Sequence, residues 1–179
     1  MKLLSRVIFF KLLNWKLIGT IDPSVEKCVV IVAPHTSWYD FFLGLLVRRI
    51  LDLQINFIGK KELFKPPFGW YFRWVGGVPL DRTPNQNKVE AITGIFRKRK
   101  IFRLALSPEG TRKKTERWKT GFYYIARSAE VPIIKVAFDY GQKEVRIAPP
   151  VYTTKNTEED LNKIYSFYDG VTGKKPENF

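Results

Sequence analysis

Two apolar runs of strand length, each followed by a polar loop and then by a helical pattern, most constrain how this chain can fold. The first is the strand predicted at Cys28–Ala33, and the second is the strand predicted at Phe102–Leu106. Continuous apolar runs of this length are typical of strands that are buried on both faces, as in parallel sheets covered by helices. The segments at 37–51 and 119–130 read as such helices. The pattern predicts an α/β domain.

The remaining segments extend this alternation along the chain. Further strands are predicted within 55–60, 131–140 and 144–152, and further helices at 87–100 and 157–165. The aromatic segment at 64–82 contains three prolines and three glycines, so we expect mostly irregular structure or short helical turns there. A length of 179 residues suits one domain. We therefore predict a single α/β domain over residues 21–179, with a mixed, mostly parallel sheet flanked by helices.

The N-terminal segment is apolar and aromatic, but basic residues are spread through it. A spanning helix needs about 20 mostly apolar residues, and a signal peptide needs an unbroken apolar region with a small-residue cleavage site. Residues 1–20 satisfy neither requirement. We predict a short amphipathic helix in the membrane interface, with Phe9, Phe10 and Trp15 in the acyl boundary. The alternative is a helix that packs on the protein's own core.

The charge of the chain points to an anionic partner. Lys and Arg number 31 against 17 acidic residues, which gives a formal net charge of +14. Nucleic acid, an anionic membrane and a phosphorylated substrate would each fit that charge. The single cysteine, Cys28, excludes an intrachain disulfide, as expected of a cytosol-facing protein. One cysteine and one histidine also cannot form a zinc site of the usual kind, so we predict no metal site.

Polar loops follow both apolar strands, where open α/β sheets bind their ligands. PHTSWYD follows the first strand and SPEGTR follows the second, so the loops meet if the strands are near neighbours. His35 precedes a predicted helix and Asp40 lies about one turn into it. The carboxylate can then reach back to one imidazole nitrogen, while the other nitrogen takes a proton from a hydroxyl. Glu109 adds a carboxylate to this site, and Arg112 adds a guanidinium that can bind phosphate.

Other interpretations of these residues stay open from the sequence. A histidine in such a loop is often structural. Ser37 or Cys28 could be a nucleophile, although Ser37 also suits a helix N-cap and Cys28 suits a buried strand. Ten basic residues against two acidic ones lie between Arg97 and Lys119, which would fit a nucleic-acid-binding module. The aromatic residues form no obvious stacking platform, so we expect no nucleic-acid partner.

Four blocks in order resemble the glycerolipid acyltransferases, a family that includes the bacterial 1-acylglycerol-3-phosphate acyltransferases. The first block is His35 to Asp40, a histidine and an aspartate separated by four residues. The second runs from Lys60 to Arg82, the third is PEGTR at 108–112, and the fourth is VPIIKVAF at 131–138. The blocks cover most of residues 28–138. Each is weak alone, and together they are highly specific.

The resemblance implies acyl transfer from a thioester, on CoA or acyl carrier protein, to the hydroxyl of a lysoglycerolipid. It implies His35 as general base, Asp40 as its orienting acid and Glu109 as the acid of the third block. It also implies that substrate is bound by Lys60, Arg82, Gly110, Thr111 and Arg112. Lysophosphatidate is the default acceptor, and similar enzymes also use lyso-ornithine lipids. We expect no metal or other cofactor, an anionic membrane as partner, and peripheral or monotopic attachment at the cytoplasmic face.

Overall fold

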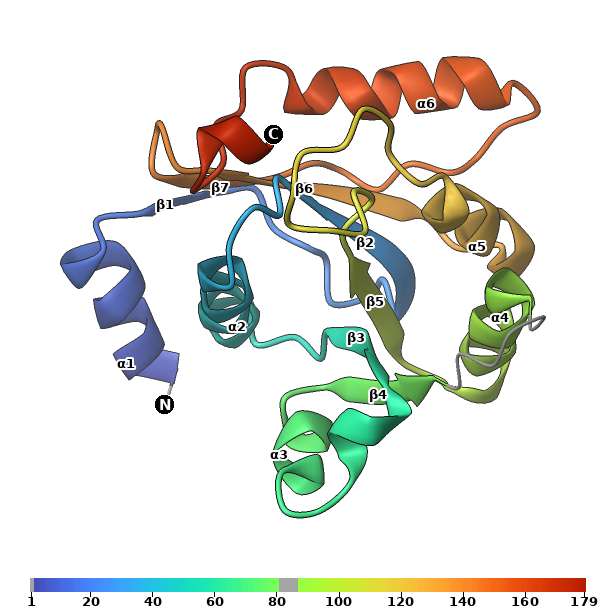
Figure 1. Cartoon of the computed structure of the whole chain (residues 1–179), viewed down its shortest axis with the longest axis horizontal. Coiled ribbons are helices and arrows are strands. Elements are labelled where there is room, and N and C mark those ends of the chain that lie inside the picture. The colour runs from blue at the N-terminus through green and yellow to red at the C-terminus, as the bar shows by residue number, and fades with distance from the viewer. Residues whose placement is uncertain (1, 81–86) are drawn as a thin grey trace.

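The described residues, 2–80 and 87–179 of this computed structural model, build a seven-stranded sheet covered by helices on both faces (Figure 1). The strands are β1 Lys16–Ile18, β2 Lys27–Ala33, β3 Asn56–Lys60, β4 Gly77–Leu80, β5 Phe102–Leu106, β6 Ile133–Asp139 and β7 Glu144–Ile147. The α-helices are α1 Lys2–Arg6, α2 Tyr39–Leu51, α3 Gly69–Trp74, α4 Lys88–Lys98, α5 Gly121–Ala129 and α6 Thr157–Tyr165. A π-helical stretch, Val7–Leu12, continues α1, and 3-10 turns lie at Lys61–Phe64, Ser166–Tyr168 and Pro176–Asn178. The predicted single α/β domain is confirmed.

The order of the strands puts the two predicted polar loops side by side. The sheet runs β1-β7-β6-β2-β5-β3-β4, and β6 and β7 form its one antiparallel pair among the described residues. The first apolar strand, β2, lies between β6 and β5, and Val29 is paired with Leu104. Both loops therefore follow the carboxyl ends of adjacent parallel strands, which meets the condition under which the sequence predicted that they come together.

Two hydrophobic clusters fix the helices to the sheet. One cluster joins α4, α5 and α6 to one face, through side chains such as Phe96, Tyr123 and Ile164. The other joins the N-terminal helical segment and α2 to the opposite face, through Phe9 and Val47. In Figure 1, α1 and α2 accordingly lie to the left of the sheet, and α4 and α5 lie to the right. The apolar strands are thus buried on both faces, which explains their continuous hydrophobicity.

The N-terminal segment differs from its prediction in how its aromatic residues are used. Phe9 is fully buried and Trp15 is 7% exposed, both within the cluster under α2. Their predicted place in a lipid acyl boundary is therefore wrong, because the protein's own core encloses them. Leu3 and Leu4, by contrast, are 75% and 62% exposed. Apolar surface therefore remains on the outer side of this segment.

Two further results concern the same part of the chain. Residues 16–18, expected to belong to the helix, form β1 and pair in parallel with β7. No described helix combines the length and hydropathy needed to cross a membrane.

The proline-rich aromatic segment contains a strand that the sequence did not predict. β4 pairs in parallel with β3 and forms one edge of the sheet. An edge strand tolerates Pro79, because a proline there does not interrupt a central hydrogen-bonded ladder. The short helix α3 precedes it, in agreement with the helical turns predicted there. Together α3 and β4 form the lower lobe in Figure 1.

Candidate active site

The two polar loops are joined by a carboxylate that holds a backbone amide. The N–H of His35 is donated to both carboxylate oxygens of Glu109, with nitrogen–oxygen distances of 2.9 and 3.1 Å. His35 follows β2 and Glu109 follows β5, so this contact bridges adjacent strands. Glu109 is only 2% exposed. It fixes the backbone at the position of the chain's one histidine.

The imidazole of His35 belongs to a chain of polar side chains. Its Nδ1 lies 3.2 Å from Oδ2 of Asp40, whose side chain is 2% exposed, against 32% for that of His35. The N–H of Ser37 is donated to the same Asp40 oxygen over 2.9 Å. The hydroxyl of Tyr140 is donated to the other Asp40 oxygen over 2.7 Å. A carboxylate held from both sides favours a proton on Nδ1 and leaves Nε2 as the basic nitrogen.

The start of α2 explains why Asp40 can reach back to the histidine. The helix begins at Tyr39, and Trp38 occupies the cap position without a capping side chain. Ser37 Oγ accepts the N–H of Tyr39, while Asp40 accepts the N–H of Ser37. This reciprocal pair resembles a capping box and turns the first helical residues toward the loop. The prediction of Ser37 as the N-cap is therefore off by one residue. Trp38 occupies the N-cap position, and Ser37 caps the helix from the residue before it.

Two ionisable groups of the site are shifted by burial. The pKa of Glu109 rises from its ordinary 4.5 to about 7, mainly because burial penalises the carboxylate, although the His35 N–H opposes the shift. The pKa of the Tyr140 hydroxyl rises too, first through burial and then through its bond to Asp40. Tyr140 therefore stays a hydrogen-bond donor at neutral pH. Titratable groups shifted in this way are common in functional sites.

The substrate-binding residues predicted from the sequence differ in their surroundings. Gly110 has a φ of +66°, and a Cβ there would lie 2.8 Å from Nζ of Lys119, so the loop is tight at that position. Thr111 Oγ1 accepts the N–H of Lys113 over 3.2 Å and is exposed. Arg82 lies outside the described residues.

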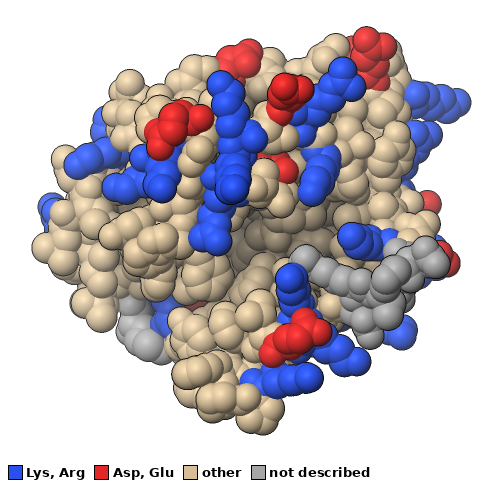
Figure 2. Space-filling model, viewed as in Figure 1, with Lys and Arg blue, Asp and Glu red and all other residues tan. Residues whose placement is uncertain are grey.

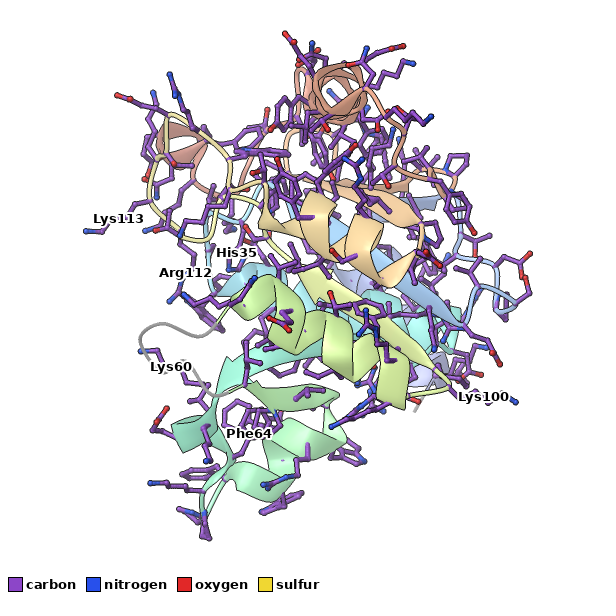
Figure 3. The ribbon with its side chains drawn as sticks, turned by 90° about the vertical axis from the view of Figure 1, so that its right-hand side faces the viewer. His35, Lys60, Phe64, Lys100, Arg112 and Lys113 are labelled. Atoms are coloured by element: carbon purple, nitrogen blue, oxygen red, sulfur yellow. The ribbon has the colours of Figure 1, made fainter. Side chains whose placement is uncertain are left out.

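Lys60 and Arg112 are exposed residues on the side of the molecule that carries His35. Lys60 ends β3, and Arg112 lies in the loop after β5. Figure 3 shows both on the same side as His35. Figure 2 shows Lys and Arg side chains gathered around a hollow on the face viewed in Figure 1. The structure thus brings His35, Asp40 and Glu109 into contact, and Lys60 and Arg112 are exposed on the same side of the molecule.

The C-terminal tail supports the histidine loop, which the sequence gave no reason to expect. Thr36 is 2% exposed, and its Oγ1 accepts the N–H of Lys175 over 3.1 Å. A Cβ on Gly173 would lie 2.8 Å from the Thr36 methyl group, so this tail residue packs directly on the loop. Tyr140 is likewise remote in sequence from the aspartate that it contacts. Both contacts depend on strand order and lack a local sequence signal.

The two alternative nucleophiles are both buried. Cys28 is fully buried, and burial raises the pKa of its thiol to about 12, so it stays a thiol at neutral pH. Ser37 is 5% exposed, and its oxygen already accepts the N–H of Tyr39. In the described part of the chain, no group of three or more His, Cys, Asp or Glu side chains is placed to hold a metal ion.

Comparison with known proteins identifies the family. A family model described as "Acyltransferase" matches residues 19–139, which is more than half of the chain. The chain belongs to the acyltransferase family. The matched region of this acyltransferase contains every contact described between His35, Asp40 and Glu109.

Individual relatives agree with this membership. A 1-acyl-sn-glycerol-3-phosphate acyltransferase from Streptococcus pneumoniae is 30% identical over 118 residues, covering 65% of this chain and 43% of the relative. One from Saccharomyces cerevisiae is 27% identical over 174 residues, covering 85% and 56%. The chain thus spans about half the length of these curated relatives. The crystal structure of the 1-acyl-sn-glycerophosphate (LPA) acyltransferase PlsC from Thermotoga maritima matches with a TM-score of 0.61 and 21% identity, over 93% of this chain and 74% of that one, which shows the shared fold.

Proposed function

We propose that this acyltransferase moves an acyl group from a thioester, on CoA or acyl carrier protein, to the free hydroxyl of a lysoglycerolipid. Lysophosphatidate is the acceptor we favour, since the relatives reported above are named for that reaction. The observation that carries the proposal is the 3.2 Å contact between His35 Nδ1 and the buried Asp40 carboxylate. That contact is the arrangement a histidine needs to act as general base.

In the proposed reaction, Nε2 of His35 accepts the proton of the lysolipid hydroxyl as its oxygen attacks the thioester carbonyl. Asp40 stabilises the resulting imidazolium through Nδ1, and Tyr140 and the Ser37 N–H hold Asp40 in place. The carbon–sulfur bond then breaks, and the imidazolium returns the proton to the departing thiolate. A thiolate is a good leaving group, so we propose that no metal or organic cofactor takes part. Glu109 acts by holding the His35 backbone.

Positive side chains on the same side as His35 suit an acceptor that carries phosphate. We propose that Lys60, Arg82 and Arg112 contact this phosphate and that Gly110 and Thr111 shape the loop beside it. Arg112 contributes a planar fork that matches phosphate oxygens. Its exposure leaves the guanidinium available to a ligand. The same cations could approach the phosphates of CoA or the acidic surface of acyl carrier protein.

Exposed apolar side chains support the proposal that the enzyme acts at a membrane surface. Leu3 and Leu4 are exposed on the N-terminal segment, and Trp38 and Phe42 are 53% and 49% exposed around the start of α2. Apolar groups of this kind insert into the headgroup boundary, and nearby lysines and arginines attract anionic lipids. We propose peripheral or monotopic attachment at the cytoplasmic face, where the thioester donors occur.

The test is an acyl-transfer assay with labelled acyl-CoA and acyl carrier protein against a panel of lysolipids. Lysophosphatidate should be acylated, and His35→Ala should lower the rate by about 10²–10⁴-fold, the usual contribution of a general base. Asp40→Asn should also lower it strongly, whereas Asp169→Asn, at an exposed site, should not.

Near-full activity of His35→Ala with an intact fold would exclude the base assignment. A preference for lyso-ornithine lipid would change the acceptor and keep the chemistry. Binding to an oligonucleotide without any acyl transfer would instead favour the nucleic-acid alternative.

A further inference from the structure

An open cavity of about 700 Å³ lies at the end of the sheet opposite to His35. It is lined by Asn56 at the start of β3, Gly77 at the start of β4, Arg99 just before β5, and the C-terminal end of α2. His35 and Glu109, in contrast, follow the carboxyl ends of β2 and β5. Because β2, β3, β4 and β5 are parallel, the cavity lies at the amino ends of these strands and the candidate active site lies at their carboxyl ends. Figure 3 shows this separation, with Lys100, the neighbour of Arg99, on the side away from His35.

The charge of this cavity is strongly positive. Four arginines line it, namely Arg48, Arg49, Arg73 and Arg99. Among the described residues of its lining, Asp52 is the one carboxylate, and Lys2 Nζ lies 3.2 Å from it. The pKa of Arg48 is lowered, first by burial and then by repulsion from Arg49. An anion in the cavity would relieve that repulsion.

Contacts within the protein hold some of these guanidinium groups in place. Arg48 donates from Nη1 to the carbonyl of Val75 over 2.8 Å, and Arg73 donates from Nη1 to the carbonyl of Phe64 over 3.0 Å. Arg49 lies over the ring of Trp74, 5.0 Å from its centre. Arginines held in this way are organised in advance for a planar, multidentate anion such as phosphate.

A buried polar residue also lines the cavity. Asn56 is 3% exposed and lines the cavity, and its Nδ2 donates to the carbonyl of Gly76 over 3.0 Å. Its Oδ1 has no hydrogen-bond partner within the described part of the chain. A buried acceptor without a donor is costly and therefore uncommon.

Apolar groups beside the cavity indicate where such a phosphate would come from. Trp74 lines the cavity and is 54% exposed, and Trp70 and Phe68 in the same segment are 69% and 66% exposed. Lys2 pairs with Asp52 of the lining, and the two residues that follow it, Leu3 and Leu4, are exposed. A cationic hollow beside exposed aromatic side chains suits a lipid headgroup.

We propose that this arginine cavity is a second phosphate-binding site, separate from the candidate active site, that receives the phosphate of an anionic membrane lipid. This proposal does not depend on acyl transfer, because its test measures binding alone. The chemistry recognised is a phosphate ester. The site would anchor the lobe containing α3 to the bilayer.

The test compares vesicle binding by Arg49→Gln/Arg99→Gln with that of a charge-matched control, Arg97→Gln/Arg127→Gln. Neither control residue lines the cavity, and both are exposed. All proteins carry Arg112→Gln, which weakens the phosphate contact proposed at the active site. On phosphatidylglycerol vesicles, the cavity variant should bind about 25-fold more weakly, about fivefold for each arginine. The control should lose much less. Equal losses would reduce the effect to general charge and overturn the proposal.

Two further arms identify the phosphate and its source. Digalactosyldiacylglycerol vesicles made equally anionic with oleate contain no phosphate, so the cavity variant and the control should bind them alike. A cavity-specific loss on these vesicles too would overturn phosphate recognition. Titration with glycerol 3-phosphate and inorganic phosphate tests a soluble source. Arginine-dependent binding of these ions without a cavity effect on vesicles would overturn the lipid assignment.

The conservative variant Arg49→Lys/Arg99→Lys controls for loss of binding through misfolding, since it keeps the charge and removes the guanidinium forks. It should bind phosphate-free anionic vesicles normally and lose part of its preference for phosphatidylglycerol. Retention of the full preference would overturn a role for the guanidinium geometry.

Discussion

Replacing Glu109 with glutamine should change how the stability of this protein depends on pH. The carboxyl group is buried, and its pKa rises from 4.5 to about 7 on folding. Between those values the unfolded chain has lost the Glu109 proton while the folded chain retains it. Because the folded state then binds more protons, the free energy of unfolding falls as the pH rises. Glutamine has no proton to lose, so Glu109→Gln should lack this fall.

The size of the effect follows from the two pKa values. The interval between 4.5 and about 7, at about 1.4 kcal/mol for each pH unit, corresponds to about 3.5 kcal/mol. The contribution is absent below pH 4.5, grows through the interval and is constant above about 7. Between pH 4.5 and about 7, the unfolding free energy of Glu109→Gln should therefore rise by this amount relative to that of the unmodified protein.

The measurement is urea unfolding, followed by tryptophan fluorescence at a series of pH values from 4 to 8. Glu116→Gln is the matched control, because it removes one carboxylate from an exposed position in the same loop. A difference between variant and unmodified protein that stays flat across this range would refute the argument. So would an equal pH-dependent difference for Glu116→Gln.

Three other substitutions test separate contacts. Phe9→Ala should destabilise the fold by about 3–5 kcal/mol, because the ring is fully buried; an unchanged melting temperature would contradict that packing. Tyr140→Phe should lower kcat about tenfold and alter its pH profile with little change in KM, since it removes a hydrogen bond to the charged Asp40; a pure KM effect would exclude this positioning role. Arg112→Lys should raise the KM for lysophosphatidate, and Arg112→Ala should raise it further, with exposed Arg117→Ala as control; equal damage with a phosphate-free acceptor would exclude phosphate recognition.

Local sequence determined the parts of this protein whose structure depends on near neighbours. The apolar run of β2 required burial on both faces, and hence helices on both sides of a mostly parallel sheet. Asp40 is the second residue of α2, so its contact with His35 follows from the local start of the helix. The sequence also placed the loops of His35 and Glu109 at the carboxyl ends of their strands, but their meeting required β2 and β5 to be neighbours, which the tertiary structure decided.

Tertiary structure decided the contacts between distant segments. Tyr140 reaches Asp40 across 100 positions of sequence, and Lys175 reaches Thr36 across 139. No local pattern encodes such pairs, because they depend on which strands become neighbours and how the chain ends pack.

The burial of Phe9 has the same origin. A helix with apolar side chains on several sides can present any of them to a core, and the packing of α2 selected Phe9 while leaving Leu3 and Leu4 outside. β4 escaped prediction because its proline and glycine are typical of loops, and only its position at the sheet edge makes it a strand. Sequence thus determined the periodic elements and the chemistry at their ends, whereas the order of the strands determined which distant side chains support that chemistry.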